Sequence, residues 1–221
     1  MKLYQCPSSP NCIKVRAVAY ELGVELELAT VNIFKGEARA PEHEALNPNG
    51  LVPVLVDGDF VLWESNAILT YVAEMQPPFA PTSAREHADV ARWLHWQAAH
   101  LSPAVTKVAF ERFVKPMSRV GPIDHAAATT AAAEFLRCSS VLDASLASTA
   151  YLTKRLSVAD FAVACILSSA RMVGLTVDAF PRTKDWLARM LARESMRRAF
   201  TDARLATMAL YEVDRSDPAQ D

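Results

Sequence analysis

The chain has 221 residues, of which 51% are hydrophobic, and a formal net charge of −2. This length allows one large or two modest domains with their own cores, and a charge so close to zero gives no electrostatic footprint for nucleic acid. No apolar run approaches the ~20 residues that a membrane span needs. Four cysteines are too few for a disulfide framework, and the strand-like start leaves no room for a signal peptide. We therefore expect a cytoplasmic protein that binds neither nucleic acid nor membranes.

The first part of the chain alternates strand and helix patterns. Residues 3–5 predict a short strand, and the apolar periodicity after Pro10 predicts a helix that stops at Gly23. Alternating polar and apolar residues at 25–31 predict a second strand. A strand, a helix and a strand within about thirty residues form a βαβ unit.

A hairpin and a helix start follow this unit. Residues 54–56 and 60–62 predict two strands joined by a turn at Gly58. Pro53 stands at the entry of the first strand, where it cannot donate to a sheet, and Ser65 stands where a helix N-cap is expected. The two ends of the hairpin therefore meet, in an arrangement that can hold an extended, peptide-like ligand.

The second part of the chain is helical in pattern. A proline-rich segment at 77–82 predicts a linker between a domain at 1–76 and an all-helical domain at 83–210. We expect one long helix from 83 to about 115, and a helix at 161–172 that is apolar almost all round, as in a bundle centre. Further helices near 123–146, 183–192 and 195–208 and a polar tail complete the prediction, with the tail at 211–221.

Two helix starts carry the signal of a capping box. Ser83 precedes Glu86 by three residues, and Ser157 precedes Asp160 by the same spacing. In each pair the two side chains can satisfy backbone N–H groups reciprocally at the first turn.

Four segments, spread over both halves, resemble motifs of a single family. Residues 47–53 resemble its approach to a cis-proline, and residues 63–68 resemble its Glu-Ser glutathione clamp. Residues 96–104 resemble a helix segment of its bacterial members, and residues 157–161 resemble the capping box of its core helix. The chain is thus similar to the cytosolic glutathione transferases, and among them to bacterial, serine-type members. The resemblance implies an α/β thioredoxin-like N-terminal domain plus an all-α C-terminal helical bundle. It also implies a homodimer that uses glutathione as co-substrate and no metal.

The start of the first helix carries the groups that glutathione activation needs. A thiol with a pKa of about 8.5 is mostly protonated at neutral pH, whereas the thiolate is the nucleophile. A hydroxyl that donates to the sulfur stabilises the anion by about 1.5–3 kcal/mol, and a helix N-terminus adds roughly 0.3–1 kcal/mol. The resemblance assigns this hydroxyl to Ser9, with Asn11 where some bacterial relatives use an amide. Alternatively, Ser8 takes the role, or both serines are only turn and capping residues.

Two cysteines lie close to these serines in sequence. Cys12 has the spacing of the second cysteine of a thioredoxin motif but lacks the first, so we interpret it as a small packing residue. Cys6 stands three positions too early to align with the cysteine of cysteine-type transferases. A redox role for either thiol stays open.

The hairpin supplies the predicted clamp. The resemblance implies that the main chain of Val52, beside a cis-Pro53, pairs with the cysteinyl part of glutathione as a one-residue strand addition. It also implies that Ser65 binds the γ-glutamyl carboxylate at a helix N-terminus, and that Glu64 meets the ammonium group. Without the resemblance, Ser65 is simply an N-cap and Glu64 a favourable charge in the first turn.

The glycine end of glutathione lacks the partner that the family often provides. The position before Val52 is often Gln or Lys, whereas here it is Leu51, which cannot bind a carboxylate. Lys35 or His43 are the candidates to replace it.

The second substrate, a small electrophile, is expected between the first loop and the long helix. Packing is the simpler role for each residue there taken singly. The candidates are Trp96, His100, Pro103, Val105, Lys107 and Phe110.

The leading hypothesis is a dimeric glutathione transferase that stabilises the glutathione thiolate for attack on a small electrophile. A second hypothesis is glutathione-dependent reduction of disulfides or peroxides. A third is a non-catalytic, transferase-like binding module, which the departure at Leu51 keeps open.

Overall fold

The structure, a computed structural model, describes residues 1–77, 79–118 and 120–215, with side chains up to residue 210. The chain divides into two compact units, which we call unit 1 (Met1–Pro77 with Arg193–Asp221) and unit 2 (Pro78–Ala192). No helix in the described ranges is both long enough and apolar enough to cross a membrane.

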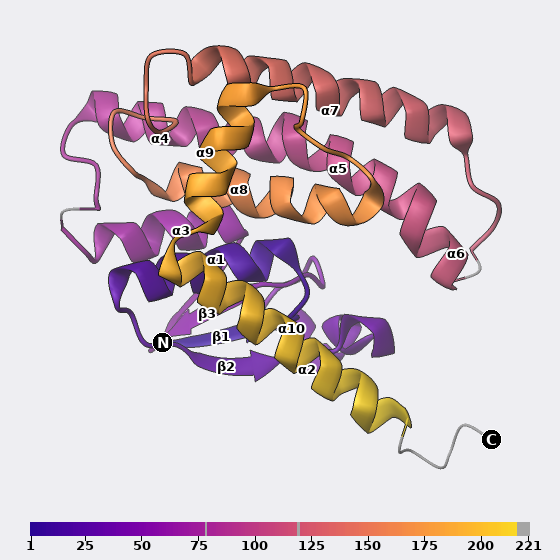
Figure 1. The fold of residues 1–221 in the computed structure, drawn as a ribbon. Helices are drawn as coiled ribbons and strands as arrows, with labels where there is room; N and C mark the ends of the chain where they lie inside the picture. The colour runs from indigo at the N-terminus through magenta and orange to yellow at the C-terminus, as the bar shows by residue number, and fades with distance from the viewer. Residues whose placement is uncertain (78, 119, 216–221) are drawn as a thin grey trace. The chain divides into compact units, whose positions relative to one another are not determined.

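Unit 1 is built on a four-stranded mixed sheet with the strand order β2-β1-β3-β4 (Figure 1). Strand β1 runs parallel to β2 and antiparallel to β3, and β3 runs antiparallel to β4. The strands are β1 (Lys2–Gln5), β2 (Glu27–Thr30), β3 (Val54–Asp57) and β4 (Phe60–Trp63). Leu3 and Leu55 are cross-strand partners and both are fully buried, so this pair anchors the centre of the sheet.

Two helices of unit 1 begin at the sheet and pack against each other. Helix α1 (Pro10–Leu22) joins β1 to β2, begins with a proline and ends at Gly23, whose φ of 67° allows the left-handed C-cap. Helix α3 (Ser65–Glu74) follows β4 directly. The segment between β2 and β3 forms only short turns, η1 (Ile33–Lys35), η2 (Glu37–Arg39) and α2 (Pro41–Glu44). The predicted strand and helix order of this half is confirmed.

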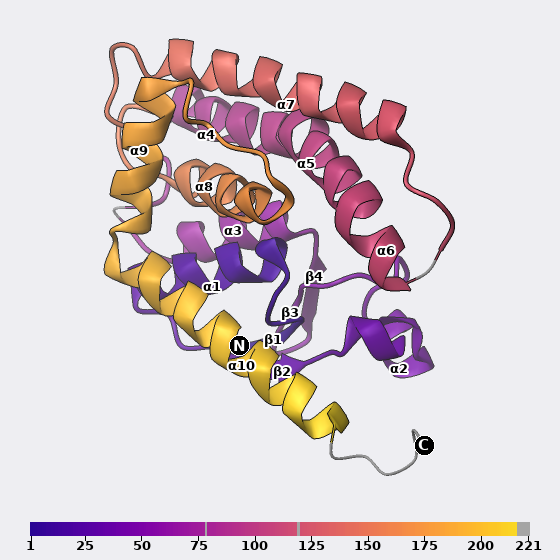
Figure 2. The same ribbon diagram turned by 45° about the vertical axis from the view of Figure 1, so that its right-hand side comes forward.

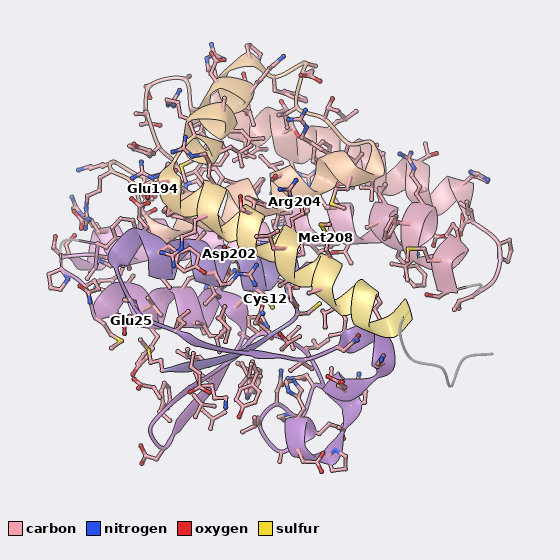
Figure 3. All side chains as sticks on the ribbon, turned by 60° about the horizontal axis from the view of Figure 1, so that its bottom comes forward. Cys12, Glu25, Glu194, Asp202, Arg204 and Met208 are labelled. Atoms are coloured by element: carbon pink, nitrogen blue, oxygen red, sulfur yellow. The ribbon has the colours of Figure 1, made fainter. Side chains whose placement is uncertain are left out.

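The C-terminal helix α10 (Glu194–Arg215) packs against α1, in unit 1 (Figure 3). The Tyr20 hydroxyl donates to the Asp202 carboxylate at 2.7 Å, and the Arg198 guanidinium lies 4.0 Å from the Tyr20 ring centre. The sequence analysis placed this helix in the helical domain, because its pattern does not reveal which partner it contacts. The helix also extends past the predicted end at residue 208. Of the predicted tail, residues 216–221 lie outside the described residues.

Unit 2 is all helical, as predicted. Helix α7 packs along α5, while α4 and α9 both pack against α8 (Figure 2). Its elements are α4 (Ala84–Trp96), η3 (Gln97–Leu101), α5 (Ser102–Ala109), η4 (Phe110–Val114), α6 (Lys115–Ser118), α7 (His125–Ser145), α8 (Val158–Ala170), η5 (Arg171–Val173) and α9 (Pro181–Leu191).

The single long helix predicted from residue 83 to about 115 is wrong in one respect. Two π-helical turns, η3 and η4, interrupt it. Each ends with a backbone hydrogen bond that spans five residues instead of four, from Ser102 N–H to Gln97 O and from Lys115 N–H to Phe110 O. A proline follows directly after Ser102 and after Lys115. A proline inside a helix lacks an N–H and its ring collides with the carbonyl four residues earlier, so a widened turn relieves both defects.

The two predicted capping boxes differ in the structure. The Asp160 carboxylate accepts from the Ser157 N–H at 3.0 Å, so this box is formed at the start of α8. At the start of α4, Ser83 Oγ accepts from the Glu86 N–H at 3.2 Å, but the Glu86 carboxylate accepts from the Thr82 N–H one residue earlier. The capping box at the start of α4 is therefore shifted, because the Glu86 carboxylate pairs with the N–H of Thr82 and not with that of Ser83.

Asp160 is fully buried and accepts hydrogen bonds on both carboxylate oxygens. The Leu152 N–H and the Trp186 indole donate to Oδ1 at 2.9 and 3.1 Å, and the Ser157 N–H and hydroxyl donate to Oδ2 at 3.0 and 3.2 Å. The Asp160 side chain thus joins the start of α8 to α9 and to the loop that precedes α8.

We predict that Asp160→Asn lowers the free energy of unfolding by about 2–4 kcal/mol, because an amide has one acceptor oxygen and leaves buried donors unpaired. Urea unfolding with an unchanged m value measures the loss. Asp185→Asn, at an exposed position of α9, is the matched control and should change stability by less than about 0.5 kcal/mol. Wild-type stability in Asp160→Asn would contradict this account of the bundle.

Candidate active site

Three predicted site segments meet at one end of the unit 1 sheet. The register pairs Tyr4 with Val54 and Val54 with Trp63. Residues just after β1, just before β3 and just after β4 therefore lie at the same sheet end. Antiparallel pairing thus brings the loop before α1, the Val52-Pro53 pair and the start of α3 together.

The peptide bond between Val52 and Pro53 is cis, as the resemblance implies. Pro53 is buried, and Val52 is half-buried just ahead of the first paired residue of β3. The main chain of Val52 precedes the ladder of the sheet, so its polar groups lie at the strand end rather than within it.

Glu64 and Ser65 form the sharp entry into α3. Glu64 is the N-cap and has φ 70° and ψ 107°, a conformation that costs a non-glycine residue about 1–3 kcal/mol and recurs at functional sites. Ser65 is buried and is the first residue of the helix rather than the N-cap that was predicted, because the backbone reverses one residue earlier. Its backbone N–H is consequently one of the unpaired donors of a helix N-terminus.

Ser9 is the N-cap of α1. Its backbone carbonyl accepts from the Cys12 and Ile13 N–H groups at 3.0 and 2.9 Å, while its hydroxyl makes no capping bond in the described part of the chain. Asn11, in the first turn, is half-buried, and Ser8 is exposed with its hydroxyl 3.5 Å from the Cys6 sulfur. The Ser9 side chain is thus not used to cap the helix on which it stands.

Cys12 is a packing residue, as the sequence analysis interpreted it. Burial raises the pKa of its thiol to about 12, although the Cys6 backbone and the Ser9 hydroxyl act in the opposite direction. A thiol with so high a pKa is protonated at neutral pH and is a poor nucleophile. Cys6 is also buried, and neither cysteine forms a disulfide.

Arg16 anchors the loop that precedes α1. Its buried guanidinium donates to the Pro7 carbonyl at 3.0 Å, to the Gln5 side chain and to the Ala199 carbonyl of α10 at 3.4 Å. The backbone that leads to Ser9 is therefore attached both to the sheet end and to the C-terminal helix.

The loop before Val52 is held by two side chains. The His43 Nε2–H donates to the Leu51 carbonyl at 3.0 Å, and the Asn47 amide donates to the same oxygen at 2.8 Å. His43 is buried by this contact, so its imidazole is turned into the loop and away from solvent. The Leu51 side chain is 57% exposed. His43 therefore does not replace the missing polar residue at position 51.

Arg39 is a cation near this loop that the sequence analysis missed. Its side chain lies against Gly50, where an added Cβ would come within 2.7 Å of the Arg39 Cδ and Nη1 atoms. Its guanidinium is exposed and lies 3.6 Å from the Glu44 carboxylate. Lys35, the residue that was predicted, is exposed at the end of η1. The sequence did offer a signal for this cation, since Arg39 lies two residues before the proline that starts α2.

The predicted electrophile residues all lie on the helical run from α4 to η4 in unit 2. Val105 is buried and packs inside the bundle, whereas the others are half-buried or exposed. Phe110 has the Lys107 and Lys115 ammonium groups 5.8 and 5.6 Å from its ring centre. The half-buried or exposed set is Trp96, His100, Pro103, Lys107 and Phe110.

Glu111 anchors the π-helical turn that carries Phe110. Its carboxylate is almost fully buried and lies 2.7 Å from the Lys115 ammonium and 3.1 Å from that of Lys107, and it accepts from the Asp124 N–H at 2.9 Å. The hydrogen bond from Lys115, with those from Asp124 and Lys107, lowers the pKa of Glu111 to about 2.

A metal site is not formed by the residues that the structure describes. No group of three or more His, Cys, Asp or Glu side chains lies close enough together to hold an ion in those ranges.

The chain matches two protein-family models in sequence. Residues 1–74 match the N-terminal domain of glutathione S-transferases, and residues 101–194 match the C-terminal domain. A probable glutathione S-transferase of Oryza sativa subsp. japonica is 34% identical over 88% of this chain and 93% of its own length. Glutathione S-transferase 3 of Zea mays is 33% identical over 90% of this chain and 92% of its own.

Solved structures agree with these sequence matches. A glutathione transferase from Phanerochaete chrysosporium, crystallised with oxidized glutathione, superimposes with a TM-score of 0.85 at 26% identity, covering 94% of this chain and 96% of its own. Two domains matched in order, two relatives above 30% identity and the same fold leave one conclusion. This chain belongs to the cytosolic glutathione transferase family.

We predict that Glu111→Gln lowers the Tm at neutral pH but not near pH 2. The folded-state pKa of about 2 lies below the ordinary value of 4.5, so the ionised carboxylate stabilises the fold above pH 4.5. That contribution is lost as the pH falls from 4.5 to about 2. Thermal unfolding across this window checks the prediction.

The control for this prediction is Glu134→Gln, which removes an exposed ion pair with Arg137 on α7. It should leave the Tm and its pH dependence nearly unchanged. If the Tm of Glu111→Gln and the Tm of the wild type changed with pH in parallel, the ionised Glu111 carboxylate would not stabilise the fold as predicted.

Proposed function

We propose that this glutathione transferase is a serine-type enzyme, in which the Ser9 hydroxyl stabilises the glutathione thiolate for attack on a small electrophile. The observation that carries the proposal is the meeting of Ser9, the cis Val52-Pro53 pair and Ser65 at one end of the unit 1 sheet. The two sequence relatives described above come from plants, so they support the family and not its bacterial members in particular.

The thiolate is stabilised at the N-terminus of α1. Ser9 is the N-cap, and its hydroxyl is not used for capping among the described residues, so it can donate to a ligand sulfur. Asn11 and Ser8 are the alternative donors.

The γ-glutamyl and cysteinyl parts bind to the hairpin ends. The Ser65 hydroxyl and N–H donate to the γ-glutamyl carboxylate at the N-terminus of α3, and the exposed Glu64 carboxylate meets the ammonium group. Val52 pairs its main chain with the cysteinyl residue beside Pro53. These contacts place the sulfur of glutathione beside Ser9.

The glycine carboxylate is bound by a cation at the other side of the loop. Arg39 rests on Gly50, next to Leu51, and offers a planar guanidinium that can bind a carboxylate with two hydrogen bonds. Lys35 is the second candidate. A cation reaching over the backbone thereby replaces the side chain that Leu51 cannot supply.

The electrophile is proposed to contact the helical run of unit 2. Its candidate contacts, Trp96, His100, Pro103, Lys107 and Phe110, combine aromatic surface with an ammonium group, which suits an aromatic electrophile with electron-withdrawing substituents.

We further propose a cytoplasmic homodimer. Strand β4 is an edge strand whose Phe60, Val61 and Trp63 side chains are 45%, 37% and 39% exposed, a surface that a second copy of the chain could cover. All four cysteines lie in the described residues and none of them forms a disulfide, which suits a reducing compartment.

We predict that Ser9→Ala lowers kcat/KM for a chloronitroaromatic electrophile by about tenfold to hundredfold, because one charge-assisted hydrogen bond to the thiolate is lost. The variant should keep most of its affinity for immobilised glutathione, since the clamp is untouched. Steady-state kinetics at saturating glutathione measure the effect.

Ser8→Ala is the matched control for this measurement, since Ser8 is the exposed neighbour of Ser9. An unchanged rate in Ser9→Ala would sink the assignment, and a loss in Ser8→Ala or Asn11→Ala would then move the role to that residue.

We predict that Arg39→Gln raises the KM for glutathione about tenfold but leaves the KM for γ-glutamylcysteine, which lacks the glycine, unchanged. The comparison of the two thiols isolates the glycine end from the rest of the clamp. Lys35→Gln is the control. If Lys35→Gln rather than Arg39→Gln abolishes the preference for glutathione, the two cations exchange their assigned roles.

A further inference from the structure

The carbonyl oxygen of Leu51 accepts hydrogen bonds from two side chains of the segment that precedes it. The imidazole Nε2–H of His43 donates to this oxygen at 3.0 Å, and the side-chain amide of Asn47 donates to it at 2.8 Å. Both residues are buried, so water competes little for the carbonyl. The two donors together fix the direction in which the carbonyl points.

The two donors are themselves held in place. The Asn47 side-chain oxygen accepts from the Asn49 N–H at 3.1 Å and from the Asn49 side-chain amide at 3.0 Å. The His43 ring lies edge-on to the ring of Tyr4, with 6.3 Å between the ring centres. Tyr4 stands on β1, at the end of the sheet where the proposed site lies. The carbonyl is therefore oriented relative to the sheet and not only within its own loop.

The direction of the Leu51 carbonyl also sets the direction of the next N–H group. The peptide bond between Leu51 and Val52 is trans, so its atoms lie in one plane and its C=O and N–H groups point to opposite sides. His43 and Asn47 consequently turn the Val52 N–H away from themselves. Within the described ranges, the main chain of Val52 makes no hydrogen bond of its own.

The cysteinyl residue of glutathione offers the groups that match this main chain. In an antiparallel strand addition, the protein residue donates its N–H to a ligand carbonyl and accepts from a ligand N–H. The Val52 carbonyl belongs to the next peptide unit, which leads to Pro53, so its direction is set separately. Only the contact made by the Val52 N–H depends on how the Leu51 carbonyl is held.

We propose that His43 and Asn47 are positioning residues, which hold the Leu51 carbonyl so that the Val52 N–H donates to the cysteinyl carbonyl of glutathione. The inference rests on the proposed function of this site. Neither side chain touches glutathione in this assignment, and both act through the peptide unit between Leu51 and Val52. The pair thereby favours thiols that carry a carbonyl oxygen beside the cysteine α-carbon.

Three thiols test this assignment. Glutathione and γ-glutamylcysteine both carry a cysteinyl carbonyl oxygen, whereas γ-glutamylcysteamine has the γ-glutamyl group, the amide N–H and the thiol but no such oxygen. A variant that misdirects the Val52 N–H should therefore raise the KM for the first two thiols and leave the KM for γ-glutamylcysteamine unchanged. Because γ-glutamylcysteine lacks the glycine, it separates this effect from the glycine end.

His43→Phe and Asn47→Asp each remove one donor. Phenylalanine keeps a ring beside Tyr4, and aspartate keeps an acceptor for Asn49. Each variant should raise the KM for glutathione about threefold to tenfold, with kcat at saturating glutathione changed less than threefold. The double variant should raise the KM by more than the product of the two single effects, because each donor holds the same oxygen when the other is lost.

Three further variants separate positioning from folding. His43→Gln places an amide nitrogen near the position of Nε2 and should restore a KM close to that of the wild type. Glu42→Gln, at the exposed neighbouring position of α2, should change nothing. Val18→Ala shortens a fully buried side chain of α1, so it should lower the Tm without changing the KM for glutathione relative to that for γ-glutamylcysteamine.

The outcomes separate this inference from the proposed function. If the wild type conjugates none of the three thiols, the proposed function fails and the inference fails with it. If the wild type conjugates glutathione, but the single and double variants change the KM of all three thiols equally or not at all, the inference alone is overturned. A KM raised only for the two thiols with the carbonyl oxygen supports it. Should His43→Phe not fold, the same comparison in Asn47→Asp decides.

Discussion

The pairing of β3 with β1 on one side and β4 on the other is the constraint on which the site depends. Because both pairings are antiparallel, the end of β1, the start of β3 and the end of β4 lie at one end of the sheet. A shift of one residue in the register of β1 against β3 would put Leu3 and Leu55 on opposite faces of the sheet. The burial of the sheet centre therefore also determines which loops meet at its edge.

Helix starts supply most of the chemistry at that edge. Ser9 and Ser65 stand at the beginnings of α1 and α3, where unpaired N–H groups and the helix dipole both favour anions. Two buried basic side chains fix the positions of these helix starts. Arg16 donates to the Pro7 carbonyl before α1, and Lys14 donates to the Asn66 side chain in the first turn of α3. Unit 1 thus places two buried basic side chains and an unusual backbone conformation at Glu64 close to where an anionic peptide is proposed to bind.

Unit 2 is held by a different set of polar contacts. Asp160 joins the start of α8 to α9, and Glu111 joins η4 to the start of α7 through Asp124. Both carboxylates are buried and fully supplied with donors, so each specifies one arrangement of its helices. The exposed face that the π-helical turns present, including Phe110, is therefore carried on a firmly anchored scaffold.

The sequence by itself determined the order of strands and helices, the stop at Gly23, the capping box of Ser157 and Asp160, and the likeness to one family, because each depends on neighbouring residues in the chain. It also contained the signal for both π-helical turns, in the prolines at 103 and 116, which was overlooked. Only the tertiary structure decided that α10 packs on α1, that His43 turns inward to Leu51, and that Glu64 takes a positive φ. The packing of α10 on α1 joins residues far apart in the sequence, and the other two features depend on how the loops at the sheet end fold, neither of which local propensity encodes.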